Sequence, residues 1–127
     1  MGKSSAIFRI SDLAQEFGVT TRTIRHYEEL GLLKPEREGQ ARIYSRGDRT
    51  RLKLILRGKR LGFSLQESRD IIQLYDPDHN NKQQLQLLLG SIAKQKQRLR
   101  EQLEDIHSML GELDSAEAEC RRALSQS

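Results

Sequence analysis

The sequence predicts a mainly α-helical fold, with one small β-hairpin in its first half and a long coiled-coil helix in its second half. Short segments of the first half carry apolar residues at helical spacing, between Ser, Thr and Gly residues of the kinds that begin and end helices. Residues 34–45 contain Pro35 and Gly39 and end in an apolar–polar alternation, which is typical of a hairpin. From about residue 82 onward, apolar residues recur every seven positions in two rows, as in a coiled coil. The predicted domain limits are residues 1–75 for the first domain, 76–81 for a linker loop and 82–127 for the long helix.

The first two helices are expected to be short and to follow each other closely. Residues 8–10 favour a strand, and Ser11 is placed to cap a helix that ends before Gly18. Thr20 is placed to cap the next helix, because its hydroxyl can accept a backbone N–H of the first turn. Two short helices joined by a turn of three or four residues that contains glycine match the helix-turn-helix motif.

The hairpin at residues 34–45 would form a wing beside this motif. In its second strand the alternation of Arg42, Ile43 and Tyr44 predicts that Ile43 faces inward and that the other two side chains face outward. The first domain is therefore predicted to be a winged helix-turn-helix domain.

Two capping boxes predict the helices that follow the wing. Ser45 with Asp48, and Ser64 with Glu67, have the spacing at which side chain and backbone cap each other reciprocally. The boxes predict helices at residues 46–61 and 65–75. The core face of the second helix is expected to consist of Leu65, Ile71, Ile72 and Tyr75.

The long helix is expected to pair with a second copy of the chain, because no element of the first half is long enough to cover its apolar stripe. The two rows alternate by four and three residues over five heptads, which favours a two-stranded coiled coil. Gly111 is a candidate break in the helix. The predicted dimerisation residues are Leu85, Leu89, Ile92, Leu99, Leu103, Ile106, Leu110 and Leu113.

The charge distribution favours an acidic partner for the first half. Residues 1–63 hold 14 Lys and Arg against 7 Asp and Glu, whereas residues 64–127 hold 8 against 11. Such a basic half is expected if it faces the phosphates of nucleic acid, and a solvated basic surface is the alternative. No apolar run approaches the roughly 20 residues that span a bilayer, and Met1–Ala6 lack the apolar run of a signal peptide. With Cys120 as its one cysteine, the chain is expected to be cytoplasmic, with no membrane partner.

Arginines in the second short helix are the best candidates for reading DNA. Arg22 and Arg25 lie three residues apart and share a face, together with Thr21 near the helix start. The planar guanidinium can bind O6 and N7 of guanine together. His26 and Tyr27 are better placed for backbone phosphates or for core packing. The candidate DNA-binding residues are Ser11, Thr20, Thr21, Arg22, Arg25, His26, Tyr27, Arg42, Tyr44 and Arg46.

Other kinds of site find little support. The three histidines are far apart in the sequence and Cys120 has no nearby partner, whereas zinc needs several such ligands at tight spacing. No nucleophile elbow, phosphate-binding loop or dinucleotide fingerprint is present. We therefore expect no catalytic residues, no metal and no cofactor, and a protein that is not an enzyme.

The sequence resembles the MerR family of bacterial transcription regulators over most of residues 8–75. The matching segments are residues 18–20, 23–28, 31–35, 42–44 and 60–67. This ordered series is far more specific than a generic helix-turn-helix. One departure is His26, where the family pattern usually has an aromatic residue.

The resemblance implies a dimer joined by an antiparallel coiled coil and bound to double-stranded promoter DNA. It further implies a promoter with an overlong spacer, which the regulator twists and bends for RNA polymerase. By the same analogy, Thr21, Arg22 and Arg25 would read or flank bases. The backbone would be gripped by Tyr27, Arg42 and Tyr44.

The subgroup controlling leucine, isovalerate and fatty-acid breakdown is the most similar in residues 20–25, 39–44 and 52–60. The genes under control would then belong to branched-chain amino acid or fatty-acid catabolism. Metal-sensing members carry cysteines near both ends of the long helix, where this chain has Lys82 and only a late Cys120. The effector, if the protein has one, is therefore expected to be organic, such as an acyl-coenzyme A. The candidate ligand residues are Arg69, Tyr75, Asp76 and Lys82, and the alternative for the basic residues among them is that they are solvated helix charges.

Two alternatives remain open at this point. A DNA-architectural or recombination accessory protein would use the same winged helix to bend DNA. A coiled-coil interaction protein would use its basic half to bind some other acidic partner.

Overall fold

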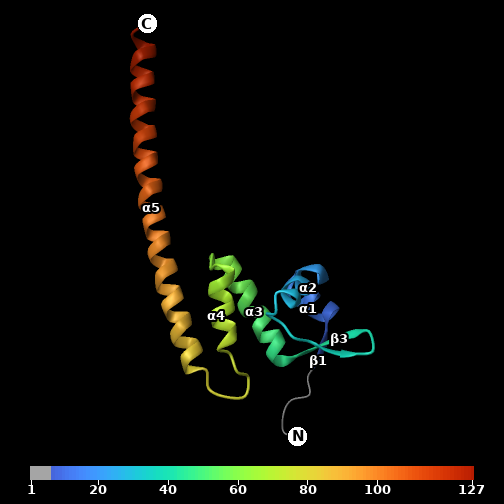
Figure 1. Ribbon diagram of the computed structural model, residues 1–127. Helices are drawn as coiled ribbons and strands as arrows, with labels where there is room; N and C mark the ends of the chain where they lie inside the picture. The colour runs from blue at the N-terminus through green and yellow to red at the C-terminus, as the bar shows by residue number, and fades with distance from the viewer. Residues whose placement is uncertain (1–6) are drawn as a thin grey trace. The chain divides into compact units, whose positions relative to one another are not determined.

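The computed structural model describes residues 7–127, which form a small sheet and a set of helices that ends in one long helix (Figure 1). The predicted mainly α-helical fold with a hairpin and a long last helix is confirmed. The prediction about a signal peptide concerns Met1–Ala6, which lie outside the described residues. The elements in chain order are β1 (Ile7–Arg9), α1 (Ile10–Phe17), α2 (Thr21–Glu29), β2 (Glu36–Glu38), β3 (Ala41–Ser45), α3 (Arg46–Leu61), α4 (Leu65–Gln73) and α5 (Lys82–Ser125).

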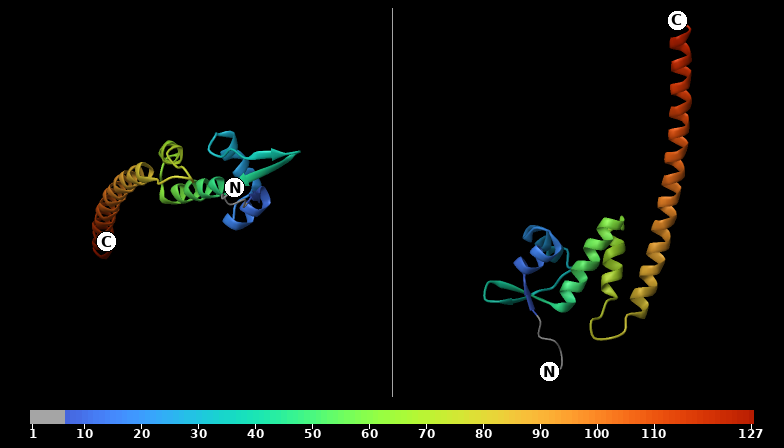
Figure 2. Two further views of the ribbon diagram at one scale, coloured as in Figure 1. Left: turned by 90° about the horizontal axis from the view of Figure 1, so that it is seen from below. Right: turned by 180° about the vertical axis from the view of Figure 1, so that it is seen from behind.

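The chain divides into two compact units, Met1–Ser91 and Ile92–Ser127. The boundary falls within α5, so the first unit runs from the sheet to the first turns of α5 and the second unit is the rest of that helix. Within the first unit, α1 and α2 pack together and α3 runs beside α4, as two further views show (Figure 2). Within residues 7–127, no helix combines the length and the apolar character needed to cross a membrane.

The sheet has three antiparallel strands in the order β1-β3-β2. The β2–β3 hairpin forms the wing, with Arg37 opposite Arg42. The strand β1 pairs with the other edge of β3 and places Phe8 opposite Tyr44. This pairing joins the start of the chain to the wing, and the sequence pattern of residues 8–10 alone could not show it.

Local side-chain caps determine where α1 and α2 begin. The carboxylate of Asp12 accepts the backbone N–H of Arg9 at 2.9 Å, so α1 begins after Arg9. The prediction that Ser11 is the cap is therefore wrong, and Ser11 lies in the first turn. Gly18 ends α1 with a φ of 66°, a backbone conformation that other residues rarely adopt. The predicted cap at Thr20 is confirmed, because its Oγ1 accepts the backbone N–H of Thr23 at 3.1 Å.

The core lies among α1, α2, the sheet and α3. Its largest fully buried side chains are Leu13, Ile24, Leu33, Tyr44 and Leu52. Both predicted capping boxes are present, and α3 has the predicted limits. The helix α4 ends two residues before the predicted limit. It buries the predicted Ile71 and Ile72, whereas Leu65 is 45% exposed and Tyr75 follows the helix end.

A close approach of α3 to α4 depends on Gly58. This glycine is buried, and a Cβ added to it would lie 2.8 Å from Oγ of Ser68 on α4. A side chain at residue 58 would therefore force the side chain of Ser68 to move.

The helix α5 is continuous through Gly111, so this candidate position does not break the helix. Its apolar rows are largely uncovered in the single chain: the side chains of Leu103 and Ile106 are 53% and 47% exposed. The other predicted dimerisation residues are also exposed, except Ile92, which is half-buried. A long apolar stripe that one chain leaves exposed needs a partner to cover it.

Candidate nucleic-acid interface

The outer face of α2 presents cations from a firmly packed helix. Ile24 and Tyr27 are buried in the core, so the helix is held by its inner face. Arg22, Arg25 and His26 are exposed, as the three-residue spacing of the two arginines predicts. Neither arginine makes an ion pair with any described residue, so both guanidinium groups are available to a ligand.

The start of α2 is suited to lie against an anion. The Thr20 hydroxyl is already engaged, because it caps the helix and bonds to the hydroxyl of Thr23 at 2.9 Å. Thr21 is half-buried in the first turn. The partial positive charge of the helix N-terminus adds to the charge of Arg22 and Arg25.

Glu28 connects α2 to the wing, a role that the sequence pattern does not indicate. The Nε–H of Arg42 donates to Oε2 of Glu28 at 2.7 Å, and Nη2 of Arg37 lies 3.6 Å from Oε1. The Arg42 and Glu28 side chains are 25% and 20% exposed. The partners are 14 residues apart in the sequence, and no local spacing rule predicts such a pair. The ion pair holds the wing beside the helix and partly neutralises Arg42.

Tyr44 points into the core, so the prediction that it faces outward is wrong. Its side chain is fully buried, and its hydroxyl has no hydrogen-bond partner among the described residues. Burial, with the nearby Glu28 carboxylate, raises the pKa of Tyr44 to about 12. The inward face of β3 is set by the core that forms around Tyr44 and by the pairing with β1, whereas Ile43 remains half-buried.

Tyr27 packs in the core, which is one of the two roles that its position in the sequence allows. It is 6% exposed and belongs to the same core cluster as Tyr44 and Ile24. Two aromatic residues that the family resemblance assigns to the DNA backbone are thus core residues.

The basic residues of α3 differ in their partners. Arg46 is exposed at the helix start and makes no ion pair with a described residue. Arg49 is bound to Glu16 of α1, with its Nε–H donating to Oε1 at 2.9 Å, and lies 5.9 Å and 5.8 Å from the ring centroids of Phe8 and Phe17. Its hydrogen bonds hold the pKa of Glu16 below the usual range. Arg49 therefore joins α1 to α3, whereas Arg46 at the helix start is available to phosphate.

The candidate ligand residues do not form one site. Tyr75 lies under the guanidinium of Arg51, at 5.4 Å from Cζ to the ring centroid, and lines a cavity with it. Asp76 is engaged within its own loop, where its backbone N–H donates to Asn81 at 2.8 Å. Arg69 and Lys82 do not line that cavity. Among residues 7–127, no three His, Cys, Asp or Glu side chains come together as a metal site requires.

Comparison with known proteins gives matches over most of the chain. The family model described as MerR HTH family regulatory protein matches residues 8–75, and the model described as MerR, DNA binding matches residues 49–116. The HTH-type transcriptional regulator ZntR of Escherichia coli K12 is 32% identical over 119 residues, which cover 91% of this chain and 77% of ZntR. The mercuric resistance operon regulatory protein of Bacillus cereus is 45% identical over 73 residues, which cover 56% of this chain and 55% of that protein.

A solved structure supports the same relationship. The crystal structure of a MerR family transcriptional regulator from Bacillus cereus superposes with a TM-score of 0.64 at 32% identity. The match covers 87% of this chain and 79% of that one.

Proposed function

The chain belongs to the MerR family of DNA-binding transcriptional regulators, and from this premise we propose that it acts as a homodimer on a promoter with an overlong spacer, which it twists and bends for RNA polymerase. The observation that carries the proposal is the outer face of α2, where Arg22 and Arg25 project from a packed helix without partners among the described residues. Its relatives are transcriptional regulators, which are not enzymes.

In this proposal α2 reads bases from the major groove. Arg22 and Arg25, flanked by Thr21, would contact base edges, since the arginine fork matches guanine. A recognition helix needs a fixed orientation, and the buried Ile24 and Tyr27 supply it.

Phosphate contacts would come from residues around α2. Arg42 on the wing and Arg46 at the start of α3 would bind the backbone, with Arg42 exchanging Glu28 for a phosphate. The exposed Ser11, Thr20 and His26 would lie along the same DNA backbone. Such contacts fix the register of the protein on the duplex, whereas base contacts carry specificity.

The homodimer would form through the apolar rows of α5. The residues proposed to bury against the partner are the eight predicted ones from Leu85 to Leu113, most of which one chain leaves exposed. In an antiparallel pair centred between Leu103 and Ile106, Leu99 of one chain faces Leu110 of the other. We further propose the predicted domain limits: reader 1–75, linker 76–81 and dimerisation helix 82–127.

The charges of α5 favour the antiparallel orientation over the parallel one. Residues 94–100 carry four Lys and Arg and no acidic residue, and residues 101–119 carry seven Asp and Glu and neither Lys nor Arg. In an antiparallel pair centred between residues 104 and 105, residues 94–100 of each chain face residues 109–115 of the other, which carry Glu112 and Asp114. A parallel pair would place like charges beside each other, which costs stability.

The genes that the protein controls are a separate proposal. Control of branched-chain amino acid or fatty-acid catabolism genes rests on sequence segments alone, and the relatives reported above give it no support. One of them is named for mercuric resistance, which is a property of that relative. The organic effector likewise rests on the lack of a metal-sensor cysteine pattern in this sequence.

The test of the proposal is binding to DNA selected from a random pool. The protein should prefer one duplex over random duplex DNA, and its affinity should fall linearly with the logarithm of salt concentration, as phosphate contacts require. Transcription from a promoter that carries the selected site should change when the protein is added. Sequence-indifferent binding, or bending of DNA without a change in transcription, would instead favour an architectural protein.

A further inference from the structure

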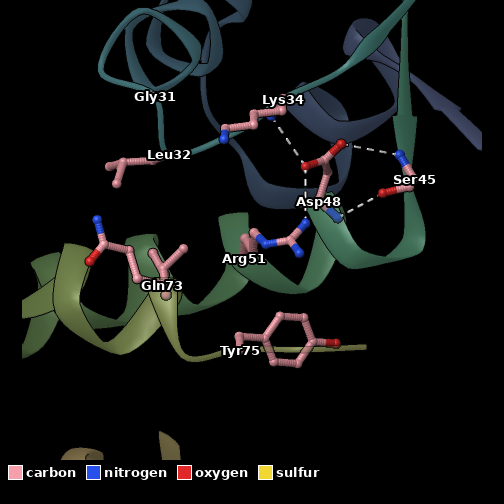
Figure 3. A pocket seen from close by; sticks show the side chains of 9 residues that line it. Gly31, Leu32, Lys34, Ser45, Asp48, Arg51, Gln73 and Tyr75 are labelled. Carbon is pink, nitrogen blue, oxygen red and sulfur yellow. Dashed lines mark hydrogen bonds and ion pairs between the residues drawn. The ribbon is translucent and has the colours of Figure 1, made fainter. Parts of the chain in front are cut away.

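A cavity of about 390 Å³ lies within the first unit, among segments that are far apart in the sequence (Figure 3). Leu32 and Lys34, just after α2, form one wall. Ser45, Asp48 and Arg51, where the wing meets α3, form another, and Gln73 and Tyr75 at the end of α4 form the third. The volume is within the range of small-molecule sites, about 300–1,000 Å³. None of the residues proposed to bind DNA lines this cavity.

The ionisable groups of the cavity leave an excess of positive charge. Asp48 is 3% exposed, and its carboxylate accepts the backbone N–H groups of Lys34 and Ser45, each at 3.4 Å. Nη1 of Arg51 donates to the same carboxylate at 3.3 Å (Figure 3). The negative charge of Asp48 is therefore balanced by Arg51, and the positive charge of the Lys34 ammonium has no acidic counterpart among the residues that line the cavity.

Arg51 is not saturated by Asp48. A guanidinium has five N–H groups, and among the described residues only Nη1 has an acceptor. The group also lies over the ring of Tyr75, which holds it in the cavity wall. Leu32 and Ile72, both nearly buried, add apolar surface.

We propose that this cavity binds a small organic anion, whose carboxylate is held by Arg51 and Lys34 and whose apolar body lies against Tyr75 and Leu32. Arginine and lysine donors next to an aromatic ring suit such a molecule, because charged hydrogen bonds orient the carboxylate while apolar contact holds the rest. A metal ion or a cationic amine does not fit the excess positive charge.

The position of the cavity would allow a bound ligand to change the affinity of the protein for DNA. Its walls include the chain just after α2, the junction of wing and α3, and the end of α4. A bound anion would link these segments and favour one arrangement of wing and recognition helix. If the anion binds the free protein and the DNA-bound protein with different affinities, it changes the affinity of the protein for DNA by the same factor. This regulatory consequence rests on the proposed function, whereas the binding itself does not.

The test begins with the full chain free of DNA. Benzoate, phenylacetate and isovalerate are titrated in a calorimeter, each beside its uncharged amide. At least one carboxylate should bind with one site per chain, and its amide should bind at least about tenfold more weakly because it lacks the charge. Failure of all three carboxylates to bind, or equal binding of the amides, overturns the proposal.

Variants locate the binding. Lys34→Gln and Tyr75→Leu should each weaken carboxylate binding, and neither residue is part of the buried core. The matched control is Lys82→Gln, which removes the same charge from the exposed start of α5 outside the cavity and should bind as the parent does. Equal loss in Lys34→Gln and Lys82→Gln would place the ligand elsewhere and contradict the assignment.

DNA binding is measured last, with the selected duplex. Added carboxylate should shift the affinity of the parent protein but not that of Tyr75→Leu. Carboxylate binding by a protein that ignores DNA would refute the proposed function and leave the cavity assignment intact. Tight DNA binding that no carboxylate affects would refute the regulatory role of the cavity.

Discussion

The arginines around the recognition helix differ in what holds their side chains. Arg25 projects from α2 with no ion pair among the described residues, whereas Arg42 is bound by Glu28 and Arg49 by Glu16. An unpaired guanidinium can form a bidentate base contact without first losing a partner. A paired one must exchange its carboxylate for a phosphate, and we therefore assign specificity to Arg25.

Replacement of Arg25 tests that assignment. Arg25→Lys keeps the positive charge but loses the planar fork, so it should weaken binding to the selected duplex by about 1–3 kcal/mol and leave binding to random DNA almost unchanged. Arg25→Ala should lose the same specificity without the flattening of the salt dependence, by about one unit, that loss of a phosphate contact produces. Both are measured by fluorescence anisotropy over a salt series. An equal loss on selected and random DNA in Arg25→Lys would contradict base reading.

Tyr44 is predicted to have no part in DNA binding, because its hydroxyl is buried and has no hydrogen-bond partner among residues 7–127. Tyr44→Phe removes this hydroxyl and should leave DNA affinity unchanged, with the free energy of unfolding equal to or up to about 1 kcal/mol above that of the parent. A loss of DNA affinity in Tyr44→Phe would show that the Tyr44 hydroxyl contacts DNA.

The raised pKa of Tyr44 adds a pH dependence with a definite sign. Its neutral form is favoured in the folded state, where the pKa is about 12 against an ordinary value of 10.0. The stability that this shift contributes is present below pH 10 and is lost as the pH rises toward 12. Urea unfolding across this range should therefore show a steeper loss in the parent than in Tyr44→Phe. Parallel curves would contradict the burial of this hydroxyl.

At the scale of elements, the sequence predicted what local chemistry decides. The boxes of Ser45 with Asp48 and of Ser64 with Glu67 act over three residues, so both helix starts could be predicted. The face of Tyr44 depends on pairing with β1 and on the core, and the wing depends on a Glu28–Arg42 contact across 14 residues. Alternation within one strand carries no information about either.

The packing of α3 on α4 yields a prediction of its own. Gly58→Ala should destabilise the protein by up to about 2 kcal/mol, because the new Cβ would lie 2.8 Å from Ser68 Oγ and 3.3 Å from Phe63 Cδ2, and this crowding outweighs the helix propensity that alanine adds. The matched control is Gly111→Ala on α5, where nothing lies within 4 Å of an added Cβ. That change should stabilise the helix by up to about 1 kcal/mol. Chemical denaturation at fixed protein concentration distinguishes them, and a Gly58→Ala protein as stable as the parent would refute the close approach.

At the scale of the whole molecule, the account requires two chains. Leu103 lies in an apolar row of α5 and is 53% exposed in the single chain. Leu103→Asp would bury an unpaired carboxylate at the centre of the proposed dimer, so monomers should replace dimers in analytical ultracentrifugation. Ser108→Asp creates the same residue at an exposed position outside the rows and should remain dimeric. A dimeric Leu103→Asp protein would show that the chains associate elsewhere.

Two copies of this chain are proposed to read one promoter, and a footprint of the protein on the selected duplex should show both copies. We expect protection of two half-sites related by two-fold symmetry, with enhanced cleavage between them where the DNA is distorted. Leu103→Asp should lose this pattern at protein concentrations where Ser108→Asp retains it. A single asymmetric half-site, protected equally by both variants, would contradict the claim.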